Sequence, residues 1–297
     1  MHANAKKSGI GPMRALFDIF SLLAASSSTS MGEKQFGKGD ILFDCIEAQQ
    51  GDIPFGDVLD AGTGSHSLQW IATLGQGKGM TSFTAITADA AMQQSVKGEA
   101  QRLGVLEGNH IVVGNWFGEL HLPQMQYDTI IADYLVGAMD GFSPYRQDEI
   151  IPKLTHLLKP GGRIYIVGLE PIPDRVEGPG NVICKIRQVR DACILLAGHR
   201  CYREYPVEWI EKQVARTPNL HLKQTDKFPI LYRFETINRQ IKVGRSKLSS
   251  FPTPSLASAM KEVFDDLERQ AFDATVNGPI KFGFDYVVSA EKTEEID

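Results

Sequence analysis

The sequence predicts an α/β fold in which a mostly parallel, doubly wound sheet has helices on both faces and carries a helical insertion. Three observations support this prediction. Short apolar runs alternate with amphipathic segments from about residue 55 to about residue 170, a glycine-containing turn follows the first run, and two long amphipathic segments precede the last run. Strands that alternate with helices at this spacing form parallel sheets, because each helix returns the chain to the edge where the strand began.

Residues 58–64, Val-Leu-Asp-Ala-Gly-Thr-Gly, form the most informative stretch. A short apolar run ends at Asp60, and Gly62 and Gly64 follow before an amphipathic segment begins. Glycines allow a sharp turn and let a ligand approach the main chain, and the next helix presents free N–H groups. Asp60 is expected at the carboxyl edge, where open α/β sheets bind ligands. A dinucleotide fingerprint is excluded because position 67 is serine, and no Gly-Lys-Ser/Thr forms a P-loop.

The segments around this turn have helical periodicity. A helix is expected over residues 41–50, and the helix after the glycine turn ends at Gly75. Residues 92–103 are predicted to form the next helix, and residues 145–158 another that Pro152 bends. Residues 137–144 are expected to form a loop.

The last third of the chain is less regular. Residues 170–180 hold three prolines and two glycines and are expected to form a loop. The pattern then predicts helices over 182–196 and 207–214, a strand within 220–231, helices over 234–247 and 256–272, and a strand over 282–288. We divide the chain into an N-terminal helical segment (1–50), a core (51–200), and a C-terminal part of the core (201–297) with a helical insertion at about 233–277.

Composition narrows the function classes. A net charge of −5 argues against a broad basic surface for nucleic acid. The four cysteines lack a Cys-x-x-Cys pair and the histidines lack ligand spacing, so we expect free thiols in a reducing compartment and no metal. No apolar run is long enough to span a membrane. Residues 1–30 have the composition of a transit peptide, whereas residues 13–25 have the periodicity of a helix. We therefore expect a cytoplasmic protein, with an organellar one as the alternative.

Five segments, in order, resemble the class I S-adenosylmethionine-dependent methyltransferases. They are Asp60-Ala61-Gly62-Thr63-Gly64, residues 82–89, residues 111–116, residues 127–134 and Leu158-Lys159-Pro160-Gly161-Gly162 with the apolar run to Val167. Together they cover roughly residues 55–170. The resemblance implies a Rossmann-like sheet, closed by an antiparallel edge strand at 282–288, and makes residues 51–200 a domain that binds S-adenosylmethionine.

The resemblance also implies contacts with that cofactor. Asp60, Gly62, Thr63 and Gly64 form the loop at its methionine end. His66 replaces a glycine that many members carry, and it either orients the cofactor carboxylate or fills space. The acid expected at the end of the second strand is Thr87 here, with Asp89 two residues later, so either residue is the candidate for the ribose.

Further candidates follow the third, fourth and fifth strands. Asn115 is expected to meet the adenine amine and Trp116 to pack on the ring, unless Trp116 belongs to the core. Asp133 is a cofactor candidate and Tyr134 a catalytic one, although Tyr134 also suits core filling. Glu170 is a candidate base, or a solvated loop residue.

An aromatic and basic stretch offers the best site for substrate recognition. Tyr202, Arg203 and Tyr205 are the candidates, and a basic series from Arg233 to Lys247 lies in the insertion. Such charges can bind a carboxylate or phosphate, or form a solvated helix face.

These observations predict methyl transfer from S-adenosylmethionine to the oxygen or nitrogen of a small molecule. Methylation of protein or RNA, aminopropyl transfer on the same fold, and a scaffold that has lost catalysis are the alternatives. Fold alone does not separate them, and the sequence does not indicate an oligomeric state.

Overall fold

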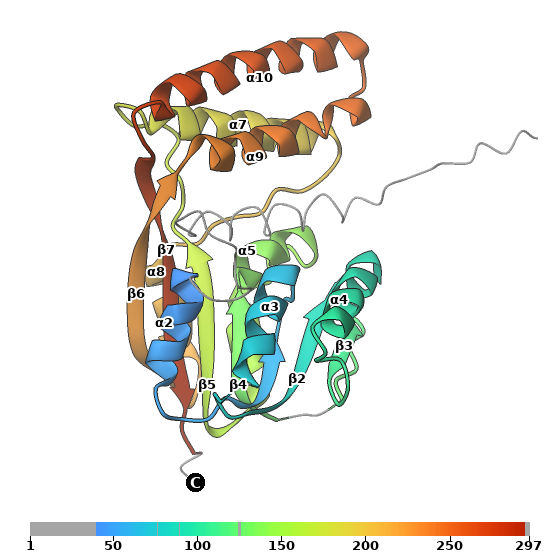
Figure 1. The fold of residues 1–297 in the computed structure, drawn as a ribbon, viewed down its shortest axis with the longest axis vertical. Helices are drawn as coiled ribbons and strands as arrows, with labels where there is room; N and C mark the ends of the chain where they lie inside the picture. The colour runs from blue at the N-terminus through green and yellow to red at the C-terminus, as the bar shows by residue number, and fades with distance from the viewer. Residues whose placement is uncertain (1–39, 76, 89, 124–125, 295–297) are drawn as a thin grey trace, which may run out of the picture.

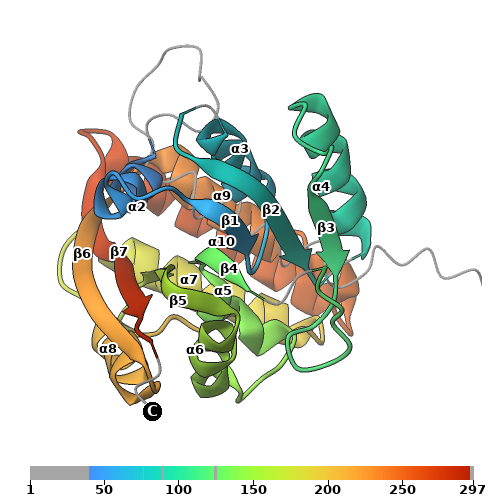
Figure 2. The same ribbon diagram turned by 90° about the horizontal axis from the view of Figure 1, so that it is seen from below.

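The computed structural model describes residues 40–294, apart from residues 76, 89 and 124–125. The predictions for residues 1–30 and for Asp89 therefore lie outside the described residues. One sheet holds the seven strands of the described chain, which are β1 (Gly56–Asp60), β2 (Met80–Thr87), β3 (His110–Val113), β4 (Tyr127–Asp133), β5 (Leu158–Leu169), β6 (Leu220–Tyr232) and β7 (Ile280–Lys292). Their order across the sheet is β3-β2-β1-β4-β5-β7-β6 (Figures 1 and 2).

The pairing confirms a mostly parallel, doubly wound sheet. Strand β1 pairs in parallel with both β2 and β4, and β5 continues the parallel set beside β4. Strand β7 is antiparallel to both of its neighbours, β5 and β6.

The prediction that the antiparallel strand lies at the edge is wrong, because β7 lies between β5 and β6. Burial explains the arrangement. Residues Tyr286–Ala290 of β7 are buried in succession, as expected of a strand covered on both faces, whereas residues 221–224 of β6 are exposed. Polar, charged residues suit an edge strand because they discourage pairing with other chains.

Helices cover both faces of the sheet (Figure 2). On one face lie α2 (Ile41–Gln50), α3 (Ser65–Leu74) and α4 (Ala90–Arg102), and on the other lie α5 (Leu135–Ala138), α6 (Gln147–His156) and α8 (Val207–Arg216). The first face buries Trp70, which stacks on Phe43 with ring centroids 4.5 Å apart. The short helix α5 and the 3-10 turn η1 (Met139–Gly141) occupy part of the expected loop 137–144.

A third group of helices lies beyond the carboxyl ends of the strands (Figure 1). It consists of α7 (Asn181–Leu196), α9 (Phe234–Arg245) and α10 (Pro254–Thr275), and the short turn η2 (Leu248–Ser250) joins the last two. The sequence predicted α9 and α10 as an insertion, but it placed α7 in the core range. Gly244 of α9 packs directly on the ring of Phe264 in α10, so no side chain fits at that position.

All four cysteines are free thiols. None of the helices in the described chain combines the length and the apolar character needed to cross a membrane.

Candidate active site

The carboxyl ends of the parallel strands bring polar side chains to one edge of the sheet. Asp60 ends β1, Thr87 ends β2 and Asp133 ends β4. Strands β2 and β3 lie to one side of β1, and β4 lies to the other, so the chain reverses direction across the sheet between β1 and β4. Open α/β sheets bind their ligands in the crevice at such a point.

Three hydrogen bonds hold the turn after β1 in place. The amide of Ala61 donates to the carbonyl of Ile131 in β4 at 2.8 Å, and the amide of Thr63 donates to Ile86 in β2 at 2.7 Å. The indole Nε1 of Trp116 donates to the carbonyl of Ala61 at 2.7 Å. The turn is therefore attached to both neighbouring strands, which makes it a rigid wall of the crevice.

The backbone conformation of this turn does not require a glycine at either Gly62 or Gly64. Neither Gly62 nor Gly64 adopts the positive φ that favours glycine, and Gly64 has an ordinary extended φ of −131°. A Cβ at Gly62 would lie 3.1 Å from Leu135 Cδ1, so this residue packs closely on α5. Among the residues that the structure describes, no atom would lie within 4 Å of a Cβ at Gly64. The backbone conformation therefore does not require a glycine at position 64, and the approach of a ligand to the main chain there stays a prediction.

Asp60 fixes the first turn of α3 to β1. Its side chain is completely buried, and its Oδ2 accepts a 2.8 Å hydrogen bond from the hydroxyl of Ser67. The same hydroxyl accepts from the amide of Gly64 at 3.2 Å. Burial raises the pKa of Asp60 to about 6, although the bond from Ser67 opposes this rise. Within the described chain, Asp60 Oδ1 is buried without a hydrogen-bond partner.

His66 and Asp40 form a pair beside the glycine turn. His66 Nε2 lies 3.1 Å from Asp40 Oδ2, while Asp40 Oδ1 caps α2 by accepting from the amide of Leu42 at 2.9 Å. Asp40 was not predicted from the sequence, although an aspartate directly before a helix is a recognisable N-cap. The pair keeps an imidazole at the N-terminus of α3, next to the crevice.

Asp133 faces the same crevice. Burial of its side chain raises the pKa of Asp133 to about 7. The charge of His66 opposes this rise, whereas the charges of Asp60 and Asp40 add to it. The structure therefore brings together three predicted residues, Asp60, His66 and Asp133, in one acid-rich crevice.

Tyr134 follows β4 in a left-handed conformation, with φ of 48° and ψ of 17°. This conformation is rare for a bulky residue and costs about 1–3 kcal/mol. Its buried hydroxyl donates a 2.8 Å hydrogen bond to Asp285 Oδ1 in β7. Burial raises the pKa of Asp285 to about 7, and the bond from Tyr134 opposes the rise.

Asp285 was not predicted from the sequence. It alternates along β7 with Phe284 and Tyr286, so its position in the pattern suggested a solvent-facing side chain. It is in fact 4% exposed, because β7 is an interior strand with both faces covered.

Asn115 and Trp116 support the walls of the crevice. Asn115 Oδ1 accepts from the hydroxyl of Ser143 at 2.7 Å and from the amide of Phe117 at 3.0 Å, and its Nδ2 donates to the carbonyl of Phe142 at 2.9 Å. Trp116 is buried beneath the glycine turn. Their contacts with adenine remain predictions, as does a ribose contact at Thr87, which is 1% exposed.

Glu170 is held by neighbouring charges. Its Oε1 lies 2.7 Å from Lys227 Nζ and accepts a 3.4 Å hydrogen bond from the amide of Val207 at the start of α8. These contacts give Glu170 a structural use, and its role as a base remains a prediction.

The predicted catalytic tyrosine and the three predicted substrate residues line one small cavity. Tyr134, Tyr202, Arg203 and Tyr205 surround a space of about 30 Å³ together with Leu169. Tyr202 is buried, and the ring of Tyr205 packs on Trp209 with centroids 4.5 Å apart. The basic series in the insertion is in part paired internally, because Arg245 lies 2.6 Å from Asp265 and 2.7 Å from Glu268.

Comparison with known proteins supports the fold. No family model matches the chain, and no curated protein matches its sequence. A Bacillus halodurans protein assigned as a methyltransferase matches with a TM-score of 0.55 at 12% identity, over 86% of this chain and 100% of its own. The 4+2 cyclase SpnF matches with a TM-score of 0.54 at 14% identity, over 96% of each chain.

A third similar structure contains a bound ligand. It is an S-adenosylmethionine-dependent methyltransferase from Thiobacillus denitrificans in complex with S-adenosylhomocysteine, and it matches with a TM-score of 0.50 at 14% identity, over 92% of this chain and 98% of its own. Similarity at this level confirms the Rossmann-like fold that the family resemblance implied. The cyclase among these structures illustrates that the fold hosts more than one chemistry.

Proposed function

We propose that this protein is an S-adenosylmethionine-dependent methyltransferase that acts on a small molecule and releases S-adenosylhomocysteine. The observation that carries the proposal is the space that the described residues leave at Gly64, where α3 begins beside the ends of β1 and β4. Since Gly64 has an ordinary φ, the backbone does not require a glycine there, and a ligand that approaches the main chain supplies the reason for one.

The residues around Gly64 fit the charged groups of this cofactor. Its methionine part carries a carboxylate and an ammonium group. The free N–H groups of the first turn of α3, with His66, favour the carboxylate. Asp60 and Asp133 favour the ammonium group, and the unpartnered Oδ1 of Asp60 is an acceptor that such a donor would satisfy.

The cofactor would supply a methyl group on a positively charged sulfur, which an acceptor oxygen or nitrogen displaces in line. The chain itself must then position the acceptor and exclude water. Among the described groups near the crevice, Asp285 suits proton removal near neutral pH because its pKa is raised to about 7. Tyr134 would orient this carboxylate through its hydrogen bond.

A small acceptor is favoured over a macromolecule by the position of the helices. Helices α7, α9 and α10 lie beyond the carboxyl ends of the strands (Figure 1), which is the position expected of a cover over an enclosed substrate. The net charge of −5 also disfavours a nucleic acid. Methylation of protein or RNA would instead require an open cleft with a basic rim.

Aminopropyl transfer is a second candidate, because the crevice is rich in acids. The charges of Asp60 and Asp40 raise the pKa of Asp133, and those of Asp40 and Asp133 raise the pKa of Asp285. An acidic pocket of this kind suits a polyamine acceptor. That reaction uses a decarboxylated cofactor, which would leave His66 and the α3 N-terminus without a carboxylate to bind.

Calorimetric and thermal titrations separate these candidates. S-Adenosylhomocysteine, 5′-methylthioadenosine, adenosine and NAD are titrated in parallel. We expect saturable binding of S-adenosylhomocysteine, with about 2.7 kcal/mol of added stability at ~100 times its dissociation constant. Tighter binding of 5′-methylthioadenosine, which lacks the amino-acid part, would favour aminopropyl transfer. Binding of neither compound at millimolar concentration would contradict both reactions.

A further inference from the structure

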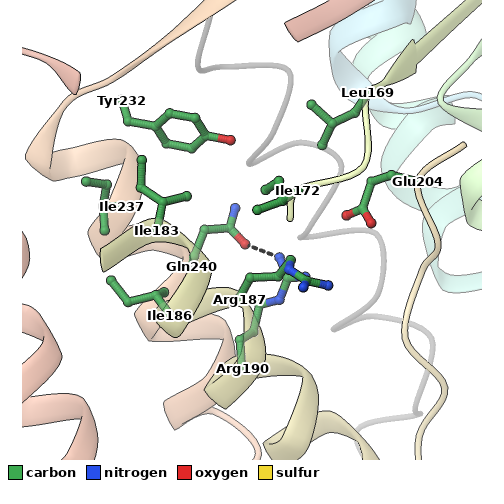
Figure 3. Close-up of a pocket in the computed structure, with 10 residues that line it drawn as sticks. All are labelled: Leu169, Ile172, Ile183, Ile186, Arg187, Arg190, Glu204, Tyr232, Ile237 and Gln240. Atoms are coloured by element: carbon green, nitrogen blue, oxygen red, sulfur yellow. Dashed lines mark hydrogen bonds between the residues drawn. The ribbon is translucent and has the colours of Figure 1, made fainter. Parts of the chain in front are cut away.

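A second cavity lies between the ends of two strands and the helices above them (Figure 3). Leu169 at the end of β5 and Tyr232 at the end of β6 form its base, and α7 and α9 form its sides. Its volume is about 20 Å³. It shares Leu169 and Glu204 with the cavity beside Tyr134, so the two spaces adjoin.

The walls of this second cavity are mainly aliphatic. The contributing side chains are Leu169, Ile172, Ile183, Ile186 and Ile237. Such a lining with a small number of polar groups is typical of sites that bind small apolar molecules.

Gln240 directs an unused donor into this space. Its Oε1 accepts a 2.6 Å hydrogen bond from Arg190 Nη1, and Arg190 is in turn held by Asp191 at 2.6 Å. Because arginine only donates, this bond fixes which end of the amide is oxygen. The Nε2 atom is buried without a hydrogen-bond partner in the part of the chain that the structure describes, and it points away from Arg190 toward the side of Tyr232 (Figure 3).

Tyr232 supplies a second polar group. The residue is 3% exposed and its side chain lines the cavity. Burial raises its pKa, so the hydroxyl keeps its proton near neutral pH and can donate it. A buried donor without a partner is costly, so the amide of Gln240, with the hydroxyl of Tyr232 in the same lining, indicates that a ligand accepts hydrogen bonds here.

The charges around the cavity select against ions. Arg187 and Arg190 lie along α7 and disfavour a cation, whereas the carboxylate of Glu204 points into the space from the opposite side and disfavours an anion (Figure 3). An uncharged oxygen that accepts from Gln240 and Tyr232 avoids both penalties.

We propose that this cavity binds the methyl acceptor, and that the acceptor is an uncharged, largely apolar molecule whose carbonyl oxygen accepts from Gln240 Nε2 and Tyr232. This inference rests on the proposed function, because it places the acceptor next to the cavity of Tyr134. A space of about 20 Å³ holds one water molecule. Entry of an acceptor therefore requires Leu169 or α9 to move, which joins the two cavities.

The proposal is tested by titrating acetophenone into the protein saturated with S-adenosylhomocysteine. Ethylbenzene lacks the oxygen, and benzoate and benzylamine carry a charge, so all three should bind more weakly than acetophenone. Gln240→Glu keeps an acceptor for Arg190 and removes the donor, and Tyr232→Phe removes the hydroxyl. Each should weaken acetophenone binding about fivefold or more, which is the loss of one hydrogen bond.

Matched controls separate local from general effects. Gln94→Glu changes an exposed glutamine of α4, and Tyr145→Phe changes a tyrosine that is 83% exposed. Neither should alter acetophenone binding, and all four variants should bind S-adenosylhomocysteine as the unmodified protein does.

Two results would overturn the assignment of this cavity. The first result is that acetophenone binds no more tightly than ethylbenzene, or does not bind at all. The other is binding that survives both Gln240→Glu and Tyr232→Phe, as expected if the cavity holds only water. Absence of S-adenosylhomocysteine binding would instead contradict the proposed function, so the two failures are distinguishable.

Discussion

The hydroxyl of Tyr134 donates a 2.8 Å hydrogen bond to Asp285 Oδ1, although 151 residues separate the two along the chain. The bond connects the end of β4, where the chain enters a left-handed conformation, to the interior strand β7. It thereby links the residue that follows β4, at the edge of the crevice, to a strand on the other side of β5. A change at either residue should affect both stability and the protonation of the site.

Removal of this hydrogen bond should destabilise the protein. Tyr134→Phe leaves a buried carboxylate oxygen without its donor, and we expect a loss of about 1–3 kcal/mol in the free energy of unfolding. Urea denaturation measures this loss, with Tyr145→Phe as the exposed control. A loss equal to that of the control would mean that the bond does not form in solution.

Asp285 should also make stability depend on pH. Its pKa is raised to about 7 in the folded protein against 3.8 for an ordinary aspartate, so the folded state binds the proton more tightly. The resulting stability is fully present below about pH 4 and is lost as pH rises through about 7. Asp285→Asn retains an acceptor for Tyr134 but does not titrate. Relative to the unmodified protein, it should gain about 1 kcal/mol or more between pH 5 and pH 8.

Urea denaturation at several pH values checks this change, with Asp52→Asn as a control at an exposed turn. Asp133 and Asp40 also raise the pKa of Asp285 and remain in the variant. A difference that stays constant from pH 5 to pH 8 would show that Asp285 does not titrate in this range.

Gly64→Val should remove cofactor binding with little effect on folding. The backbone at Gly64 is extended and, in the described part of the chain, no atom lies within 4 Å of the added Cβ, so the substitution costs about 1 kcal/mol or less at this N-cap. We expect S-adenosylhomocysteine binding to fall at least about tenfold, a loss of roughly 1.4 kcal/mol. Gly98→Val, at an equally open position in α4, should bind normally. Unchanged binding by Gly64→Val would place the cofactor elsewhere.

Gly244→Ala should loosen the packing of α9 on α10. In an exposed helix the change from glycine to alanine stabilises by about 1 kcal/mol, as we expect for Gly98→Ala in α4. At Gly244 the new Cβ meets the ring of Phe264, and we expect a net loss of about 1–3 kcal/mol. Hydrogen exchange in residues 234–275 measures the effect. Phe264→Leu in the same chain should restore part of the loss, whereas a stabilised single variant would contradict this packing.

The fold was largely predictable because its strands are short apolar runs that end at Asp60, Thr87 and Asp133. Helices α9 and α10 were predictable from their periodicity, although their packing with α7 was not, because periodicity does not identify a partner. The edge position of β7 was predicted wrongly. The consecutive apolar residues Val287 and Val288 were the available signal of an interior strand.

Two kinds of site residue were predictable from the sequence. They are the residues next to the glycine turn along the chain and the residues at the ends of strands. Asp285 and Asp40 reach the crevice from segments far apart in the chain, and Gln240 and Tyr232 become neighbours only after α9 folds over the sheet. Their roles depend on burial and on contacts between distant segments, which a sequence pattern does not contain.

The interior position of β7 has a consequence for the order in which the protein is made. Ile280–Lys292 follows every other strand in the chain, yet it separates β5 from β6. Until this segment leaves the ribosome, β6 lacks the strand that hydrogen-bonds it to the sheet. Strand β5 keeps an open edge for the same time. The crevice lacks Asp285 until the same moment, so the final strand completes the sheet and the candidate site together.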